Sequence, residues 1–145
     1  FTKAELDSRV EIEYETYAKE INIEAKAMID IAAKQIIPAV IKYTTVLAQS
    51  INAVKSACGA DISAQTEILT EVSDLLADAQ NALDKLKDVT EKASAMDEGR
   101  EQAVYYRDTV KTAMDELRAP VDKLEMLVDK SMWPMPSYGD LIFEV

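Results

Sequence analysis

The stretch from Lys3 to Ala57 constrains the fold most strongly, because its apolar residues recur every three or four positions. That spacing predicts one face of a single helix, about 80 Å long at about 1.5 Å per residue. Pro38 interrupts the stretch, but no Gly, Asn or Asp stands beside it to form a loop. We therefore expect a kink rather than a chain reversal. The apolar stripe consists of Val10, Tyr14, Tyr17, Ile21, Ala25, Met28, Ala32, Ile36, Val40, Tyr43, Leu47, Ile51 and Val54.

The first residues have the pattern of a helix start. Thr2 can cap the backbone N–H of Glu5, and Glu5 can reach back to the N–H of Thr2. Phe1 and Leu6 have the spacing of a hydrophobic staple. Because the chain begins with Phe rather than Met, we expect it to be part of a longer protein, cut just before this helix.

A second helix is predicted over residues 63–95. Gly59 suits the left-handed position that ends the first helix, and Asp61 or Ser63 can cap the second. The apolar steps alternate between three and four, which is a heptad and predicts shallow, left-handed packing. The heptad positions are Leu69, Val72, Leu76, Ala79, Leu83, Leu86, Thr90 and Ala93.

A third helix is predicted over residues 97–131, with Asp97 as its cap. Pro120 lies inside it without neighbouring turn residues, so we expect a kink or a break there. The apolar stripe of this helix is Ala103, Tyr106, Val110, Ala113, Leu117, Val121, Leu124 and Val128.

Together these patterns predict an all-α fold in which three long helices, over residues 3–57, 63–95 and 97–131, run up, down and up. Hydrophobic residues make up 48% of the chain, and only three Gly and four Pro are available for turns, which disfavours an all-β fold. We expect residues 1–131 to form the bundle. Residues 132–145, which hold the only Trp and two Pro, are expected to form an extended tail docked on a surface.

The first helix is longer than the other two, so its N-terminal end is expected to overhang them by about 30 Å. Tyr14, Tyr17 and Ile21 would lie on that overhang without cover from this chain. An uncovered apolar stripe marks an interface, so we expect this end to pack on another domain or subunit.

The formal net charge of −11 argues against nucleic acid and anionic membrane surfaces as partners. No apolar run is expected to approach the roughly 20 residues that span a bilayer, and an acidic, amphipathic N-terminus is not expected to be a signal peptide. Cys58 is the single cysteine, so it has no partner for an internal disulfide, in keeping with a cytoplasmic protein.

No catalytic, cofactor-binding or metal-binding residue is predicted in this chain. It contains no His, and so lacks the commonest general base and metal ligand. Cys58 is interpreted as a small residue filling a helix end, and Tyr105–Asp108 as a core aromatic flanked by solvated charges rather than a recognition patch. Carboxylate pairs at i,i+4 spacing are interpreted as solvated faces: Glu11/Glu15, Glu20/Glu24, Glu67/Glu71, Asp74/Asp78 and Asp84/Asp88.

The tail carries a rarer pattern. Residues 133–145 read Trp-Pro-Met-Pro-Ser-Tyr-Gly followed by Asp140 and a short apolar run. This resembles the C-terminal end of type III glutamine synthetases, the long-chain bacterial form. The resemblance extends to two upstream helices and is weakest across residues 58–100. Its upstream motifs are Asn22–Ala25, Met28–Asp30 and Ile36–Val40 in the first helix, and Tyr106–Val110, Met114 and Leu117–Ala119 in the last.

The resemblance implies a parent enzyme that makes glutamine from glutamate, ammonia and ATP with a divalent metal such as magnesium. It implies a cytoplasmic homo-oligomer of stacked rings, with the metal, ATP and glutamate residues upstream of Phe1. This chain would then be a helical appendage that contacts its own catalytic domain and neighbouring subunits.

Two other classes stay open from the residues alone. A freestanding helical scaffold or protein-interaction module would explain the heptad and the acidic surface, although it would not need the aromatic, Pro-rich tail. A metal-binding bundle enzyme is disfavoured by the absence of His.

Overall fold

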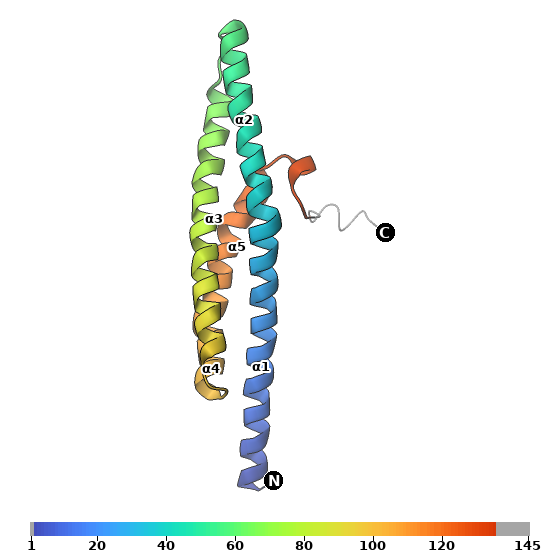
Figure 1. Ribbon diagram of the computed structural model, residues 1–145, viewed down its shortest axis with the longest axis vertical. Helices are drawn as coiled ribbons and strands as arrows, with labels where there is room; N and C mark the ends of the chain where they lie inside the picture. The colour runs from blue at the N-terminus through green and yellow to red at the C-terminus, as the bar shows by residue number, and fades with distance from the viewer. Residues whose placement is uncertain (1, 136–145) are drawn as a thin grey trace, which may run out of the picture. The chain divides into compact units, whose positions relative to one another are not determined.

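The computed structural model describes residues 2–135, and all of the regular secondary structure in that part of the chain is helical. The first long helix comprises α1 (Lys3–Ile31), η1 (Ala32–Ile36) and α2 (Ile37–Cys58). The second is α3 (Ser63–Ala95), and the third comprises α4 (Arg100–Tyr105), η2 (Tyr106–Val110) and α5 (Lys111–Leu127). The helices alternate in direction along the chain (Figure 1), which confirms the all-α, up-down-up fold class.

The chain divides into two compact units, which are described separately. Unit 1 comprises Phe1–Ile31 and Ala82–Leu117, and unit 2 comprises Ala32–Asn81 and Arg118–Val145. The core of unit 1 consists of Ala18, Ile21, Ala25, Leu83, Leu86, Val89, Ala93, Ala103, Tyr106, Val110, Ala113, Met114 and Leu117. The core of unit 2 contains Ala32, Ile36, Ile37, Val40, Leu47, Val72, Ala79, Leu124 and Val128.

The start of the first helix shows the expected cap by Thr2. The Thr2 hydroxyl oxygen accepts a hydrogen bond of 3.2 Å from the Glu5 N–H, which satisfies one of the amides left without a partner in the first turn. The proposed staple involves Phe1, which lies outside the described residues. At the other end Gly59 has φ 63° and ψ 22°, which confirms its role as the left-handed residue that ends α2.

Pro38 does not reverse the chain. It lies in the first turn of α2, directly after the π-helical segment η1. Proline removes one hydrogen bond and crowds the preceding turn, and the wider π turn relieves that crowding. The sequence carries a trace of this insertion, because the apolar stripe takes three successive steps of four from Met28 to Val40.

The second helix, α3, covers the expected range, Ser63–Ala95. The Asp61 carboxylate accepts a hydrogen bond of 3.0 Å from the Ser63 N–H at its start. This bond, together with a second one from the Ser63 hydroxyl, lowers the pKa of Asp61. Most of the heptad positions are buried, and the others are half-buried, as expected for a seam packed on its neighbours.

The expected cap of the third helix was wrong, and of the two alternatives expected at Pro120 the structure excludes the break. Gly99, with φ 145°, is the residue before α4, and no side chain caps this end, so Asp97 lies too early to act as the cap. Pro120 lies inside α5, which continues to Leu127, so the helix does not break there. The helix then ends before residue 131, because the chain turns at Asp129. That carboxylate accepts a hydrogen bond from the Ser131 N–H and starts the short 3₁₀ helix η3 (Lys130–Met132).

The beginning of the expected tail lies within unit 2. Segment η3 packs on α2, and Trp133 follows it in an extended conformation with a half-buried side chain. The prediction that Pro136–Val145 docks on a surface concerns residues outside the described part. The division into a bundle over 1–131 and a tail over 132–145 therefore stays a prediction.

One helix has the length and composition of a possible membrane span, contrary to the expectation that no apolar run comes close. Within Lys3–Cys58 an 18-residue window reaches a mean hydropathy of 1.2, with 28% of that window buried. A window average can reach this value even though single polar residues interrupt the apolar ones, whereas the expectation concerned an uninterrupted apolar run. A single such helix is weak evidence for a membrane span, since core helices of soluble proteins pass the same test.

Candidate functional site

The N-terminal end of α1 extends beyond the helices that cover it in unit 1 (Figure 1). Residues 2–9 and 11–13 are exposed, including Leu6 at 54% and Ile12 at 60%. We call residues 3–13 the overhanging segment. Its existence was expected from the helix lengths, although it is shorter than expected.

From the sequence, Tyr14, Tyr17 and Ile21 were expected to be uncovered, and the structure shows that they are not. Ile21 is only 6% exposed, and Tyr14 and Tyr17 are half-buried. The turn over residues 96–99 and helix α4 lie against α1 and extend the covered part of it. The prediction from helix lengths did not include this cover, because it left out the length that the turn adds along the helix axis.

The apolar stripe of the first helix continues into the overhanging segment, beyond the part of α1 that the other helices cover. Leu6 and Val10 precede Tyr14 and Tyr17 at steps of four, four and three, so all of them lie on one side of α1. The tyrosines are partly covered by unit 1, whereas no described residue covers Leu6. The apolar stripe of α1 therefore extends beyond the turn over residues 96–99 and helix α4, which cover part of it in unit 1.

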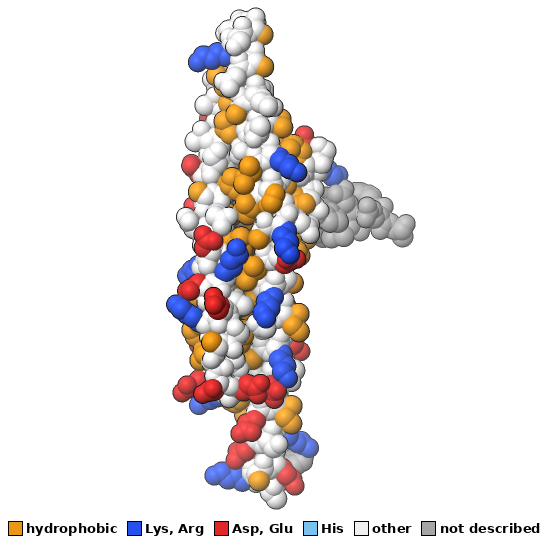
Figure 2. Space-filling model, in the orientation of Figure 1, with side chains coloured by type: hydrophobic (Ala, Val, Ile, Leu, Met, Phe, Trp, Pro, Cys, Tyr) orange, Lys and Arg blue, Asp and Glu red, His pale blue; other side chains and the backbone are white. Residues whose placement is uncertain are grey.

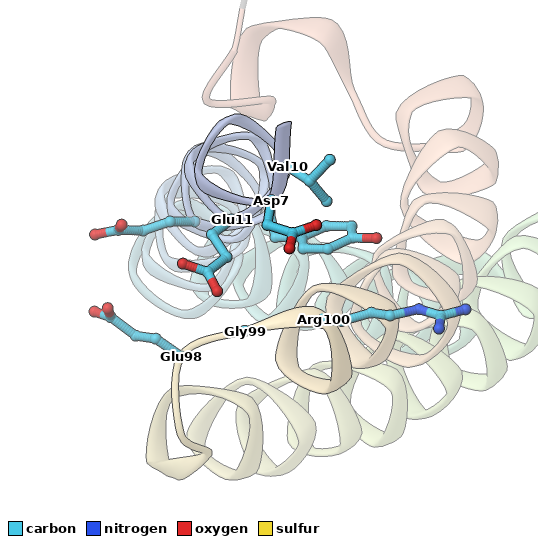
Figure 3. Close-up of a pocket in the computed structure, with 8 residues that line it drawn as sticks. Asp7, Val10, Glu11, Glu98, Gly99 and Arg100 are labelled. Atoms are coloured by element: carbon cyan, nitrogen blue, oxygen red, sulfur yellow. The ribbon is translucent and has the colours of Figure 1, made fainter. Parts of the chain in front are cut away.

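An acidic cleft of about 520 Å³ lies where this stripe leaves the bundle. Figure 3 shows that Asp7 and Glu11 on α1 face the turn with Glu98 and Gly99, whereas the Arg100 side chain extends away from these carboxylates. Figure 2 shows Asp and Glu side chains gathered at this end of unit 1. The complete lining is Asp7, Val10, Glu11, Tyr14, Glu15, Glu98, Gly99 and Arg100.

The paired carboxylates lie on the surfaces of their helices. Among the described residues, no group of three or more Cys, Asp or Glu side chains is placed to hold a metal ion. Glu11 and Glu15 line the acidic cleft, and Glu15 forms an ion pair of 2.9 Å with Lys19. Asp88 forms an ion pair of 3.0 Å with Lys92. The members of the other pairs are exposed, in agreement with the interpretation of solvated faces.

A smaller polar pocket of about 260 Å³ lies next to the acidic cleft, also within unit 1. The Tyr106 hydroxyl donates a hydrogen bond of 3.2 Å to Asn22 Oδ1. Gln102 Nε2 donates to the backbone oxygens of Ala93, at 3.0 Å, and Met96, at 3.2 Å. These bonds tie α1, the end of α3 and the start of the third helix together. The lining is Glu15, Ala18, Lys19, Asn22, Ser94, Met96, Glu98, Gln102 and Tyr106.

Burial and charge set the protonation behaviour of this pocket. Burial raises the pKa of the Tyr106 hydroxyl, because the phenolate would lose its hydration. The pKa of Lys19 is also raised, mainly by its hydrogen bond to Glu15 and further by the charges of Glu15 and Glu98. The Tyr106 phenol therefore stays neutral, and the Lys19 ammonium stays charged, to a higher pH than in a free side chain.

The comparisons with known proteins agree with one another. Residues 1–55 match the family model described as the glutamine synthetase C-terminal domain. A glutamine synthetase of Butyrivibrio fibrisolvens is 36% identical over 146 residues, covering 100% of this chain and 21% of the relative. The chain belongs to the glutamine synthetase C-terminal domain family. The resemblance drawn from the tail and the two helix motifs is thereby confirmed.

Two further relatives support the same assignment. A glutamine synthetase of Bacteroides fragilis (strain YCH46) is 27% identical over 99% of this chain and 20% of its own length. A protein of Dictyostelium discoideum named type-3 glutamine synthetase is 28% identical over 96% of this chain and 20% of its own length. The chain thus spans about a fifth of the length of the curated relatives it matches.

Two further features of this glutamine synthetase C-terminal domain had been singled out from the sequence. Tyr106 is buried in the core, whereas the neighbouring Arg107 and Asp108 are exposed and pair with each other at 2.8 Å, as expected. Cys58, expected to fill a helix end, lies exposed at the end of α2, with its sulfur 3.8 Å from the Val54 oxygen.

The sequence did not single out Asn22 or Gln102 as members of a pocket. The available signal was their position, since each amide stands next to a residue of an apolar stripe, Ile21 or Ala103. A polar residue at the border of a buried face needs a hydrogen-bond partner. The sequence could not show which partner that would be.

Proposed function

We propose that this domain is a non-catalytic part of a glutamate–ammonia ligase and that it shapes the assembly of that enzyme through its overhanging segment. The reaction of such an enzyme joins ammonia to glutamate at the expense of ATP, with magnesium, and yields glutamine. In this proposal ATP, metal and glutamate bind the rest of the protein, since the family resemblance implies that their residues lie upstream of Phe1. The enzyme would act in the cytoplasm, in glutamine biosynthesis.

The proposal rests on one observation. The apolar stripe of α1 continues onto the overhanging segment, where the described residues of unit 1 do not cover it. This segment lies at the N-terminal end of a glutamine synthetase C-terminal domain. The relatives are about five times as long as this chain. A region that precedes Phe1 in the chain would lie beside Leu6 and Val10. Covering an apolar side chain of that size contributes about 1.5–3 kcal/mol when burial is complete.

The proposed partners are therefore the catalytic domain of the same chain and the neighbouring subunits of a homo-oligomer. The net charge of −11 makes nucleic acid and anionic membrane surfaces poor partners. The carboxylates around the acidic cleft would favour a partner surface that carries basic side chains beside apolar ones.

The test places two charges on the apolar face of the full-length enzyme, as Leu6→Asp with Val10→Asp. We expect smaller assemblies in sedimentation velocity, because both carboxylates would have to be desolvated in the interface. Ile12→Asp is the control for a charge placed on α1, since Ile12 is about as exposed as Leu6 but lies on the other side of the helix. An unchanged assembly size in the double variant contradicts the proposal.

A further inference from the structure

The polar pocket of unit 1 is separate in its chemistry from the apolar face used in the proposed assembly. We infer that this pocket binds a small zwitterionic amino acid whose side chain carries a hydrogen-bonding group. The inference goes beyond the proposed function and stands on the pocket alone.

The size of the pocket limits the ligand. Its volume is about 260 Å³, which corresponds to roughly nine water molecules at about 30 Å³ each. Drug-sized ligands and cofactors occupy pockets of about 300–1,000 Å³. A nucleotide is therefore too large and a single metal ion too small, whereas a free amino acid has a suitable size.

The charged residues on the lining have both signs. Lys19 lies on α1, and Glu98 lies on the turn before α4, close enough to raise the pKa of Lys19 by its charge. A zwitterion can place its carboxylate on Lys19 and its ammonium on Glu98. Lys19 already pairs with Glu15, but both side chains are substantially exposed, at 67% and 41%. An exposed pair of this kind is weak, so Lys19 can share its donors with a ligand.

The buried part of the pocket offers hydrogen bonds without net charge. Tyr106 and Gln102 are only 2% and 8% exposed, and both line the pocket. The Tyr106 proton goes to Asn22, so the phenolic oxygen keeps the capacity to accept a further hydrogen bond. Gln102 Nε2 already donates to two backbone oxygens, so this part of the pocket offers acceptors, which match the N–H donors of a ligand carboxamide.

The backbone at this pocket departs from a regular α-helix. Tyr106 is the first residue of the π-helical segment η2, and the Lys111 N–H bonds to its carbonyl oxygen. Single π turns within α-helices are frequent at functional sites. Here the π turn coincides with the residue that joins the pocket to α1.

The experiment titrates the 145-residue chain with L-glutamine by calorimetry and follows the amide spectrum by NMR. We expect saturable binding at one site, with shifts confined to the residues that line the pocket. L-alanine, which lacks the side-chain amide, and propionamide, which lacks both charges, should each bind at least about tenfold more weakly. Putrescine, which carries cations only, tests whether the site is simply acidic.

Matched variants tie the binding to this pocket. Glu98→Gln should weaken glutamine binding about tenfold, whereas Glu101→Gln, one turn away and outside the lining, should leave it unchanged. Tyr106→Phe should weaken it by about threefold to tenfold, and Tyr105→Phe should not. Melting curves of each variant report whether the fold is kept. The inference is overturned if no probe binds saturably, if putrescine binds as tightly as glutamine, or if folded control variants lose binding equally.

Discussion

At the scale of single residues, Tyr106 meets two demands at once. Its ring is buried in the core of unit 1, and its hydroxyl reaches Asn22 on α1. A buried hydroxyl without a partner would cost about 1–3 kcal/mol, so the hydrogen bond makes the burial possible. This residue therefore links the packing of the third helix to the register of the first.

The burial of Tyr106 predicts a loss of stability at alkaline pH. The pKa of a tyrosine in the unfolded chain is about 10, and burial raises the pKa in the folded domain. The contribution of this group to stability is fully present below the unfolded pKa and is lost as the pH rises through the folded pKa. Urea unfolding at a series of pH values above about 9 measures this loss.

The Tyr106→Phe variant identifies the source of that loss. It should unfold with a weaker alkaline dependence than the wild type, whereas Tyr105→Phe should retain the wild-type dependence. Equal alkaline profiles for the wild type and Tyr106→Phe would show that another group is responsible.

Leu83 tests the heptad of α3 at the same scale. It is 1% exposed, so Leu83→Ala should lower the free energy of unfolding by about 2–5 kcal/mol through lost burial and the cavity left behind. Lys87→Ala, on the exposed side of the same helix, should change it by no more than about 0.5 kcal/mol. A melting midpoint that stays at the wild-type value in Leu83→Ala would rule out the heptad register.

At the scale of helices, the sequence predicted what periodicity determines and missed what depends on neighbours. The range of α3 and the continuity of the first helix through Pro38 followed from uninterrupted apolar steps. The π segments did not, although three steps of four around Ala32 and Ile36 were a trace of η1. The cap at Asp97 was wrong because the positive φ of Gly99 sets the start of α4, and backbone dihedrals leave no periodic signal.

A π turn is equivalent to an α-helical turn with one extra residue, and a deletion tests whether this holds for η2. Removing Asp108, which is exposed, should convert η2 into a regular α-turn and keep α4 and α5 on their buried faces. Removing Lys87 from α3 should instead rotate one half of that helix by about 100° and disrupt its seam. We expect cooperative thermal unfolding of the first deletion variant, measured by circular dichroism, and not of the second.

If the Asp108 deletion unfolds as completely as the Lys87 deletion, the π turn is required by the fold itself and is not a simple insertion.

At the scale of the whole protein, the sequence identified the family from the tail and two helix motifs, and it predicted the overhanging segment from helix lengths. It placed the uncovered stripe about two turns too far into the bundle, because the turn over residues 96–99 extends the cover of α1 as far as Tyr14. The polar pocket could not be predicted from the sequence. Asn22 and Tyr106 are far apart in the chain and come together only because α1 packs on η2.

Trp133 tests whether the segment after the third helix also serves assembly. Its side chain is half-buried next to the 3₁₀ helix that packs on α2. We expect Trp133→Ala to change the size of the assembled enzyme more than the rate of glutamine formation. An assembly of wild-type size that has lost its activity would contradict this role.

Hydrogen–deuterium exchange of the overhanging segment tests the central claim most directly. The amides of residues 3–13 would be followed in the isolated 145-residue chain and in the full-length enzyme. If this segment docks on the rest of the enzyme, its amides should exchange rapidly in the isolated chain and be strongly protected in the full-length protein. Equal exchange in the two proteins would show that the exposed apolar face of α1 is not an assembly surface.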